Sequence, residues 1–172
     1  MSIQKQLNAF KGKRVLLLAP KFFHYIGEIL DAMKDAGIDC DFLDERPLPG
    51  FTGKAIARYV PVVNERKVRE NIRQRLSENH YDYLLVIKGE SLSTKLLSDF
   101  KQANPGAKTV LFIWDSVANS KHAKAFFPDF DSVYTFDAND AAKYKIEFLP
   151  LFVGSQFDPR LTATDQQPNI DL

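Results

Sequence analysis

The sequence predicts an α/β protein with a doubly wound, mainly parallel sheet, arranged as a Rossmann-like three-layer sandwich. Short apolar runs of strand length alternate along the chain with stretches in which apolar residues recur at helical spacing. This alternation favours parallel strands joined by right-handed crossovers, with helices on both faces of the sheet. Several runs are apolar at nearly every position, which is typical of strands buried on both faces.

The predicted strands are the short apolar runs. The runs "RVLLLA" (14–19) and "YLLVIK" (83–88) are apolar at most positions, whereas the region 38–44 alternates apolar and polar side chains, as near an edge of a sheet. Pro150 should make the last strand short or place it at an edge, because proline cannot donate a backbone hydrogen bond. The expected strands are 14–19, 38–43, 83–88, 108–114, 132–136 and 146–151.

Helices are expected between these strands. In the segment 22–36, apolar residues from Phe23 to Met33 recur at helical spacing, and Gly37 follows as a stop signal. The Pro- and Gly-punctuated connection 46–61 has room for a short helix at 53–59. Further helices are expected at 64–79, at 93–103 with Ser93 as N-cap, at 119–127 and at 137–144.

Length and composition indicate one domain. A chain of 172 residues with 45% hydrophobic content can bury a sizeable core, and we assign residues 1–153 to that domain. Residues 154–172 are polar and turn-rich without a helical or strand period, so we expect a linker or tail towards a second domain that this sequence lacks. A frayed natural terminus is the alternative.

Charge and sequence signals restrict the partners and the compartment. The net charge of +1 gives no electrostatic footprint for nucleic acid, and no apolar run is long enough to span a bilayer. The polar start lacks the apolar region of a signal peptide, and the single cysteine, Cys40, excludes an internal disulfide. We therefore expect a cytoplasmic protein without a transmembrane segment, and association with the membrane surface stays open.

Strong nucleotide and hydrolase motifs are absent from the sequence. It contains no GxxxxGK[ST] or GxGxxG phosphate loop and no GxSxG nucleophile elbow. The 3 histidines show no metal-ligand spacing with cysteines or carboxylates. We expect neither a metal nor a cofactor.

Polar and aromatic side chains instead gather directly after the predicted strands. Ligands of open parallel sheets bind at the carboxyl ends of the strands, where the loops converge. The candidate catalytic residues are Glu90 and Asp115. The candidate substrate-binding residues are Lys88, Gly89, Ser91, Trp114, Ser116 and His24.

Each of these side chains has a functional and a structural interpretation. A carboxylate beside a cation can act as a general base for a hydroxyl or can orient a polyol, and Trp114 could support a sugar ring. Alternatively, Lys88 forms a structural ion pair with Glu90 or Asp115, and Asp115 caps the next helix. Trp114 could equally belong to the core, and His24 could simply pack at the start of a helix.

The segments "LLLAPKFF", "DERP", "VIKGES", "FIWDS", "YTFDAND" and "KIEFLPLF", in this order, resemble the amino-terminal half of bacterial sugar transferases with two Rossmann domains, the GT-B type. Such transferases act in capsule, lipopolysaccharide and spore-coat assembly. The resemblance covers about residues 13–153, and the KGE and WDS segments are its most specific parts.

The resemblance implies a role for the chain and for its candidate residues. The domain would hold a glycan or polysaccharide acceptor, while a missing carboxyl-terminal domain would hold the nucleotide-sugar. Lys88, Glu90, Trp114 and Asp115 would line the cleft, with Glu90 or Asp115 as the base. The isolated chain would then bind an acceptor without transferring a sugar.

Two rival classes remain beside this interpretation. A non-enzymatic binding or interaction module could use the same fold, and the lack of a sharp catalytic motif favours it. A complete small nucleotide-binding protein is disfavoured, because the glycine-rich phosphate loops are missing.

Overall fold

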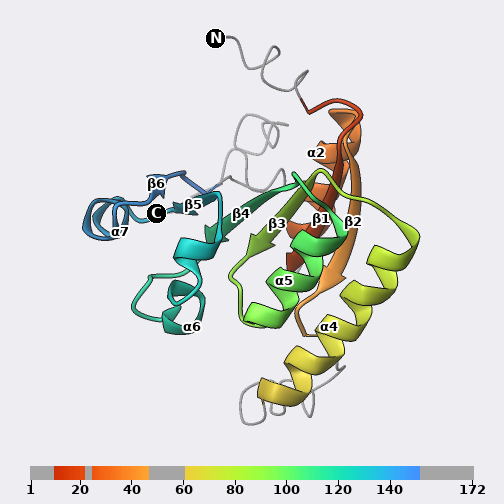
Figure 1. The fold of residues 1–172 in the computed structure, drawn as a ribbon. Helices are drawn as coiled ribbons and strands as arrows, with labels where there is room; N and C mark the ends of the chain where they lie inside the picture. Colours follow the sequence, from red (N-terminus) through yellow and green to blue (C-terminus); the bar gives the residue numbers. More distant parts are fainter. Residues whose placement is uncertain (1–9, 22–24, 47–60, 152–172) are drawn as a thin grey trace, which may run out of the picture.

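The apolar runs pair as one parallel sheet. The computed structural model describes residues 10–21, 25–46 and 61–151. Its sheet has 6 strands in the order β2-β1-β3-β4-β5-β6, and every pair is parallel (Figure 1). This arrangement confirms the predicted doubly wound α/β fold. The strands are β1 Arg14–Ala19, β2 Asp39–Asp44, β3 Tyr83–Ile87, β4 Lys108–Ile113, β5 Ser132–Thr135 and β6 Glu147–Phe148.

Most of the helices agree with the helical periods of the sequence. They are α2 Tyr25–Asp35, α4 Pro61–Glu78, α5 Thr94–Ala103, α6 Lys121–Lys124, the 3-10 turn η1 Phe127–Asp129 and α7 Ala138–Tyr144. Ser93 caps α5 as predicted, since its side chain accepts from the N–H of Leu96. The expected helix 119–127 is shorter, because Asn119 and Ser120 form a turn and Pro128 lies inside η1. The expected short helix at 53–59 lies outside the described residues.

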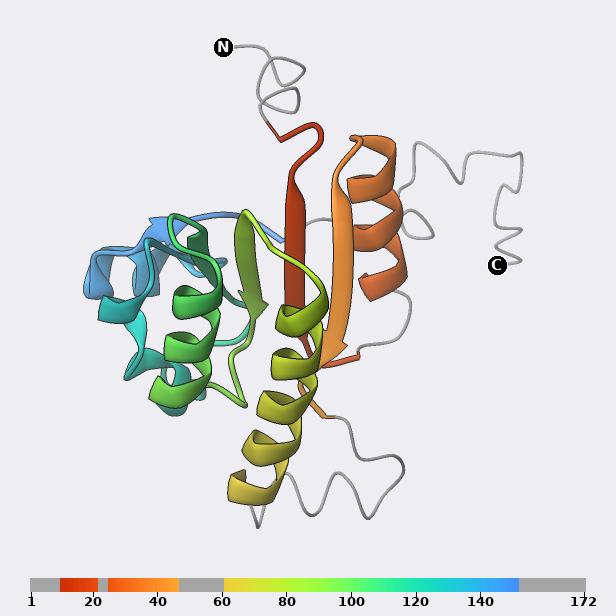
Figure 2. The same ribbon diagram turned by 45° about the vertical axis from the view of Figure 1, so that its right-hand side comes forward.

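The two faces of the sheet are covered by different helices. Leu16 and Leu18 of β1 belong to a large core cluster with residues of α4 and α5, whereas Leu17 and Ala19 belong to a second cluster with Ile26 of α2. Successive residues of a strand point to opposite faces, so this division places α2 on one side and α4 with α5 on the other. Figure 2 shows the orange helix α2 to the right of β1 and β2, and the yellow helix α4 on their other side, towards the viewer.

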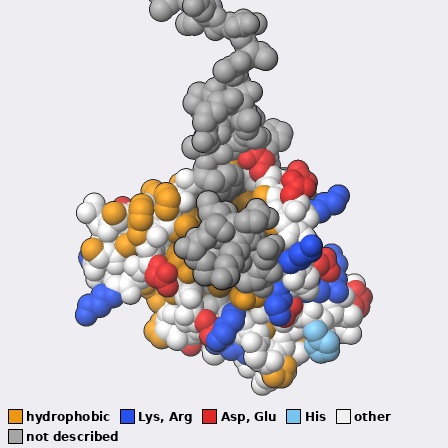
Figure 3. All heavy atoms as spheres, turned by 90° about the horizontal axis from the view of Figure 1, so that it is seen from above, with side chains coloured by type: hydrophobic (Ala, Val, Ile, Leu, Met, Phe, Trp, Pro, Cys, Tyr) orange, Lys and Arg blue, Asp and Glu red, His pale blue; other side chains and the backbone are white. Residues whose placement is uncertain are grey.

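The sheet ends in a short edge strand. Leu149 donates its N–H to Thr135, one residue beyond β6, and Pro150 then has no N–H with which to continue the ladder. Phe148, Leu149 and Leu151 are 53%, 43% and 44% exposed. Figure 3 shows hydrophobic side chains gathered at the left, the side on which Figure 1 places β6 and α7.

Strand order reverses next to β1, and this reversal positions the candidate site. From β1 the chain moves to β2 on one side and then returns to β3 on the other. The loops that follow these strands therefore diverge at their carboxyl ends, the place where ligands of such sheets bind. The residues after β2, β3 and β4 all reach this edge.

Candidate functional site

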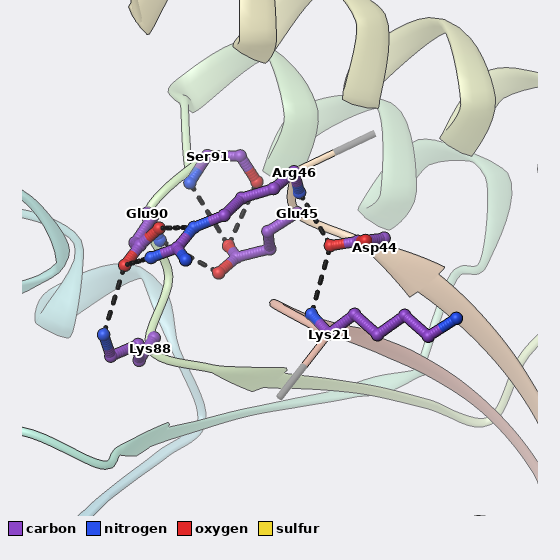
Figure 4. Close-up of polar contacts among 7 residues, drawn as sticks. All are labelled: Lys21, Asp44, Glu45, Arg46, Lys88, Glu90 and Ser91. Atoms are coloured by element: carbon purple, nitrogen blue, oxygen red, sulfur yellow. Dashed lines mark hydrogen bonds and ion pairs between the residues drawn. The ribbon is translucent and has the colours of Figure 1, made fainter. Parts of the chain in front are cut away.

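Asp44 joins the segments that leave β1 and β2. β1 and β2 pair along their whole length, from Arg14 opposite Asp39 to Ala19 opposite Asp44, so both strands end at the same level. One oxygen of the Asp44 carboxylate accepts from the N–H of Lys21 at 3.2 Å and from the N–H of Arg46 at 2.8 Å (Figure 4). The next residues of the "DERP" segment are thereby held above the end of the sheet.

Glu45 is completely buried and holds the loop that follows β3. Its Oε1 accepts from the N–H of Ser91 at 3.2 Å and from the Ser91 hydroxyl at 3.0 Å, and its Oε2 accepts from the N–H of Glu90 at 3.1 Å. Burial raises the pKa of Glu45 to about 8, against the opposing effect of these hydrogen bonds. The side chain is therefore mostly protonated at neutral pH.

Arg46 forms a bidentate ion pair with the carboxylate of Glu90. The guanidinium donates two hydrogen bonds of 2.7 Å, one to each oxygen of Glu90, and Lys88 Nζ lies 3.3 Å from Oε1 (Figure 4). Burial alone raises the pKa of Glu90, but the hydrogen bonds and charge of Arg46, with the charge of Lys88, hold it below its usual range. The ion pair that the sequence left open between Lys88 and Glu90 is present.

The loop after β3 has an unusual backbone. Both Lys88 and Gly89 have left-handed conformations, with φ of 72° and 74°. A Cβ at position 89 would lie 2.7 Å from the side chain of Leu92, so only glycine fits there. Lys88 is a non-glycine residue in a strained conformation, and such strain tends to occur at functional sites.

A pocket opens between the loops that follow β3 and β4. Its volume is about 130 Å³, and we call it the carboxyl-edge pocket. This is close to the roughly 150 Å³ of an engineered cavity that holds benzene, so the pocket has room for about one six-membered ring. It is lined by Lys88, Gly89, Glu90, Asp115, Asn119, Ser120, His122 and Ala123.

Asp115 enters this pocket from the turn after β4. Its Oδ1 accepts from the N–H of Ser116 at 2.8 Å and from the amide of Asn119 at 3.1 Å. Its Oδ2 accepts no hydrogen bond from the described part of the chain. Asp115 thus organises its own turn, but the N-cap of α6 is Ser120.

The turn after β4 is also held by the helix α7. The N–H of Val117, a residue that is 1% exposed, donates to Asp140 Oδ2 of α7 at 2.7 Å. This hydrogen bond ties the turn after β4 to α7, in addition to the pairing of β4 with β5 that ends at Ile113 and Thr135.

The other predicted site residues lie elsewhere. Ser91 is buried against Glu45, and the Ser116 hydroxyl accepts the N–H of Asn119 within the turn. Trp114 packs edge-on against Tyr25 and Phe112, with ring centroids 6.4 and 5.9 Å away, in the cluster beneath α2. This placement favours the core interpretation of Trp114 over a platform inside the pocket. His24 lies outside the described residues.

Several polar residues at this edge were not selected from the sequence. Glu45 and Arg46 follow β2 in the "DERP" segment, and their position after a strand was the available signal. Asn119 and His122 line the pocket from the region around α6, and no sequence pattern marks them. Asn119 and His122 reach the pocket only because the loop after β4 folds back towards the loop after β3.

A larger cavity of about 660 Å³ lies at the opposite, amino-terminal ends of the strands. Most of its lining is apolar or aromatic, including Val15, Tyr83, Val110 and Tyr134. Its charged lining residues, Lys108 and Asp131, pair with each other at 3.2 Å. The convergent polar side chains that chemistry requires are in the carboxyl-edge pocket instead.

Comparisons with known proteins add no family assignment. No family model matches the chain, and no curated protein shows significant similarity to it. Among the described residues, no helix is long and apolar enough to cross a membrane. No group of three or more His, Cys, Asp or Glu side chains in the same residues could hold a metal ion.

Proposed function

We propose that the chain is the amino-terminal, acceptor-side domain of a glycosyltransferase, which moves a sugar from a nucleotide-sugar to a glycan or polysaccharide acceptor. One observation carries the proposal: the carboxyl-edge pocket combines two carboxylates, an ammonium group and an amide at the ligand-binding edge of the sheet. Such groups donate to and accept from the hydroxyls of a polyol at the same time.

The size of the pocket supports an acceptor rather than a donor site. Sites for drug-sized ligands measure roughly 300–1,000 Å³. The carboxyl-edge pocket, at about 130 Å³, is too small for a nucleotide-sugar, and its size is closer to that of one ring. The donor would bind to a carboxyl-terminal domain, and the reaction would occur in the cleft between the two.

The candidate carboxylates have different roles in this proposal. Glu90 is held by Arg46 and Lys88 and has a lowered pKa, so it is a poor proton acceptor and would receive hydrogen bonds from acceptor hydroxyls. Asp115 keeps an oxygen available and would bind the hydroxyl that reacts. Lys88 and Asn119 would donate to other hydroxyls of the same ring.

Binding to the chain itself tests the acceptor half of the proposal. Isotope-labelled protein is titrated with methyl glycosides of glucose, galactose, mannose and N-acetylglucosamine, and amide shifts are followed by NMR. We expect millimolar binding of at least one glycoside, with shifts concentrated at 88–91 and 115–123. Asp99→Asn, which removes a carboxylate paired with Arg69 and Arg73 on the helical face, serves as the control and should bind normally. Shifts scattered over the surface, or none, would contradict the proposal.

A non-enzymatic binding module is the second candidate. It is favoured by the extent to which the chain's own ion pairs already satisfy Glu90. Such a module would bind a ligand at this pocket and give no transfer in any longer protein that contains the domain.

A further inference from the structure

His122 is held in one orientation at the rim of the carboxyl-edge pocket. Its Nε2 lies 2.8 Å from the backbone carbonyl oxygen of Leu92, and its ring packs edge-on against Phe126, with centroids 5.3 Å apart. One contact fixes the position of a nitrogen, and the other fixes the plane of the ring.

The contact with Leu92 also determines the tautomer of the neutral ring. A carbonyl oxygen can only accept a hydrogen bond, so Nε2 must carry the hydrogen. Nδ1 is then the nitrogen with the lone pair. It has no hydrogen-bond partner among the residues that the structure describes. A base whose other nitrogen is tied to a backbone carbonyl is the usual arrangement of an oriented imidazole.

The neighbourhood leaves this nitrogen available to a ligand. The charged groups that line the same pocket are Lys88, Glu90 and Asp115. None of them forms an ion pair with His122 in the described part of the chain, since Glu90 is held by Arg46 and Lys88, and Asp115 Oδ1 by its own turn. The side chains of His122 and Asp115 therefore line the same pocket of about 130 Å³.

We propose that His122 is the general base of this site, taking the proton from the acceptor hydroxyl that Asp115 binds. This inference rests on the proposed function. In the step, the hydroxyl proton moves to Nδ1 and the hydroxyl oxygen forms a bond to the anomeric carbon of a nucleotide-sugar. The bond from that carbon to the diphosphate breaks, and the nucleotide leaves with the electron pair. Glu90 keeps its ion pair with Arg46 throughout.

NMR spectra of the imidazole nitrogens test the inference on the chain as it is. We expect the neutral ring of His122 to carry its hydrogen on Nε2, and the glycoside that binds best to shift the Nδ1 resonance. His122→Gln should lower the affinity about fivefold, the usual effect of losing one hydrogen bond.

A matched control is available on the same chain. His80 is also an exposed histidine hydrogen-bonded to a backbone carbonyl, that of Ala103 at 3.2 Å, but it precedes β3, whereas Lys88 to Glu90 follow this strand, and it does not line the pocket. His80→Gln should leave the affinity unchanged. A hydrogen on Nδ1, or glycoside binding that shifts 88–91 and 115 without affecting His122, would overturn the role of His122 while the proposed function stands. Absence of binding to every glycoside would overturn both.

Discussion

At the scale of single residues, Glu45 shows how a buried acid supports a site without touching its ligand. Its carboxyl oxygens accept hydrogen bonds from Glu90 and Ser91, so it fixes the backbone of the loop that carries the pocket residues. The loop in turn presents Lys88 and Glu90 to the pocket. Two residues in this network give testable predictions for stability: ionisation of Glu45 should lower the free energy of unfolding, and relief of the backbone strain at Lys88 should raise it.

The stability of the fold should fall as the pH rises through the titration of Glu45. Its pKa is raised from about 4.5 to about 8, so the folded state binds the proton more tightly than the unfolded state. Its contribution is fully present below pH 4.5 and is lost as the pH approaches 8 and above. Urea unfolding between pH 5 and 8.5 should show a decrease on the order of a few kcal/mol in the free energy of unfolding.

Glu45→Gln is the matched variant for this measurement. The amide cannot ionise, so the decrease with pH should be much smaller, although the stability at pH 5 is lower because one acceptor is lost. Asp131, with a pKa of about 2, and the other carboxylates with lowered pKa values stay ionised throughout this range and add no slope. An equal slope in both proteins would exclude Glu45 as its source.

Lys88→Gly separates the binding role of Lys88 from a structural one. Glycine adopts a φ of 72° without strain, which should raise the free energy of unfolding by up to about 1 kcal/mol and offset the loss of a partly exposed ion pair with Glu90. Affinity for the glycoside should nevertheless fall. Chemical unfolding and titration of the same sample check both effects. A clear loss of stability with unchanged affinity would show that Lys88 serves only the ion pair.

At the scale of elements, α7 supports the site through one hydrogen bond. Asp140→Ala would leave the buried N–H of Val117 without its acceptor, which costs about 1–3 kcal/mol. The turn 115–120 should also loosen and weaken glycoside binding. Asp137→Ala, which removes the side-chain N-cap of the same helix, is the control: it should lower stability with little effect on binding. Thermal unfolding measures the stability of the two variants, and NMR titration measures their glycoside binding.

The extents of the elements show which physical signals the sequence carries. Strands β1 to β5 were predicted within two residues, because buried strands require consecutive apolar side chains that can be read directly. The extent of α6 was not predicted correctly. A turn at Asn119 and Ser120 replaces the first residues of the expected helix, and such turns depend on tertiary contacts. The edge position of β6 follows from Pro150, which the sequence did indicate.

The candidate site was predictable only in part for a similar reason. Parallel strands bring their carboxyl ends together, so topology alone unites Lys88, Gly89, Glu90 and Asp115 around one pocket. Partners that arrive through loop conformation, such as Arg46 and His122, have no periodic signal. The face of the sheet to which the Trp114 side chain points was not evident from the sequence. The packing beneath α2 shows which face it is.

At the scale of the whole molecule, the pocket occupies one end of the sheet and the proposal requires a second binding half. A transferase gains much of its rate from holding donor and acceptor in the correct geometry, and this effective molarity is lost when one half is missing. The 172-residue chain alone should therefore bind an acceptor and transfer no sugar. As part of a longer protein with a nucleotide-sugar-binding domain, it should transfer a sugar.

Substitutions in that longer protein would assign the roles within the pocket. His122→Gln should reduce turnover by roughly a hundredfold or more, the usual contribution of a general base, with little change in KM. Asp115→Ala should reduce turnover to a comparable extent and also raise KM, because it removes the group that binds the reacting hydroxyl. Glu90→Ala should mainly raise KM and lower thermal stability, since Arg46 and Lys88 lose their partner. Turnover per folded molecule, measured against KM and unfolding temperature, separates these outcomes. Full turnover in both the His122 and Asp115 variants would refute a catalytic role for this edge, and transfer by the chain alone would refute the division of the site between two domains.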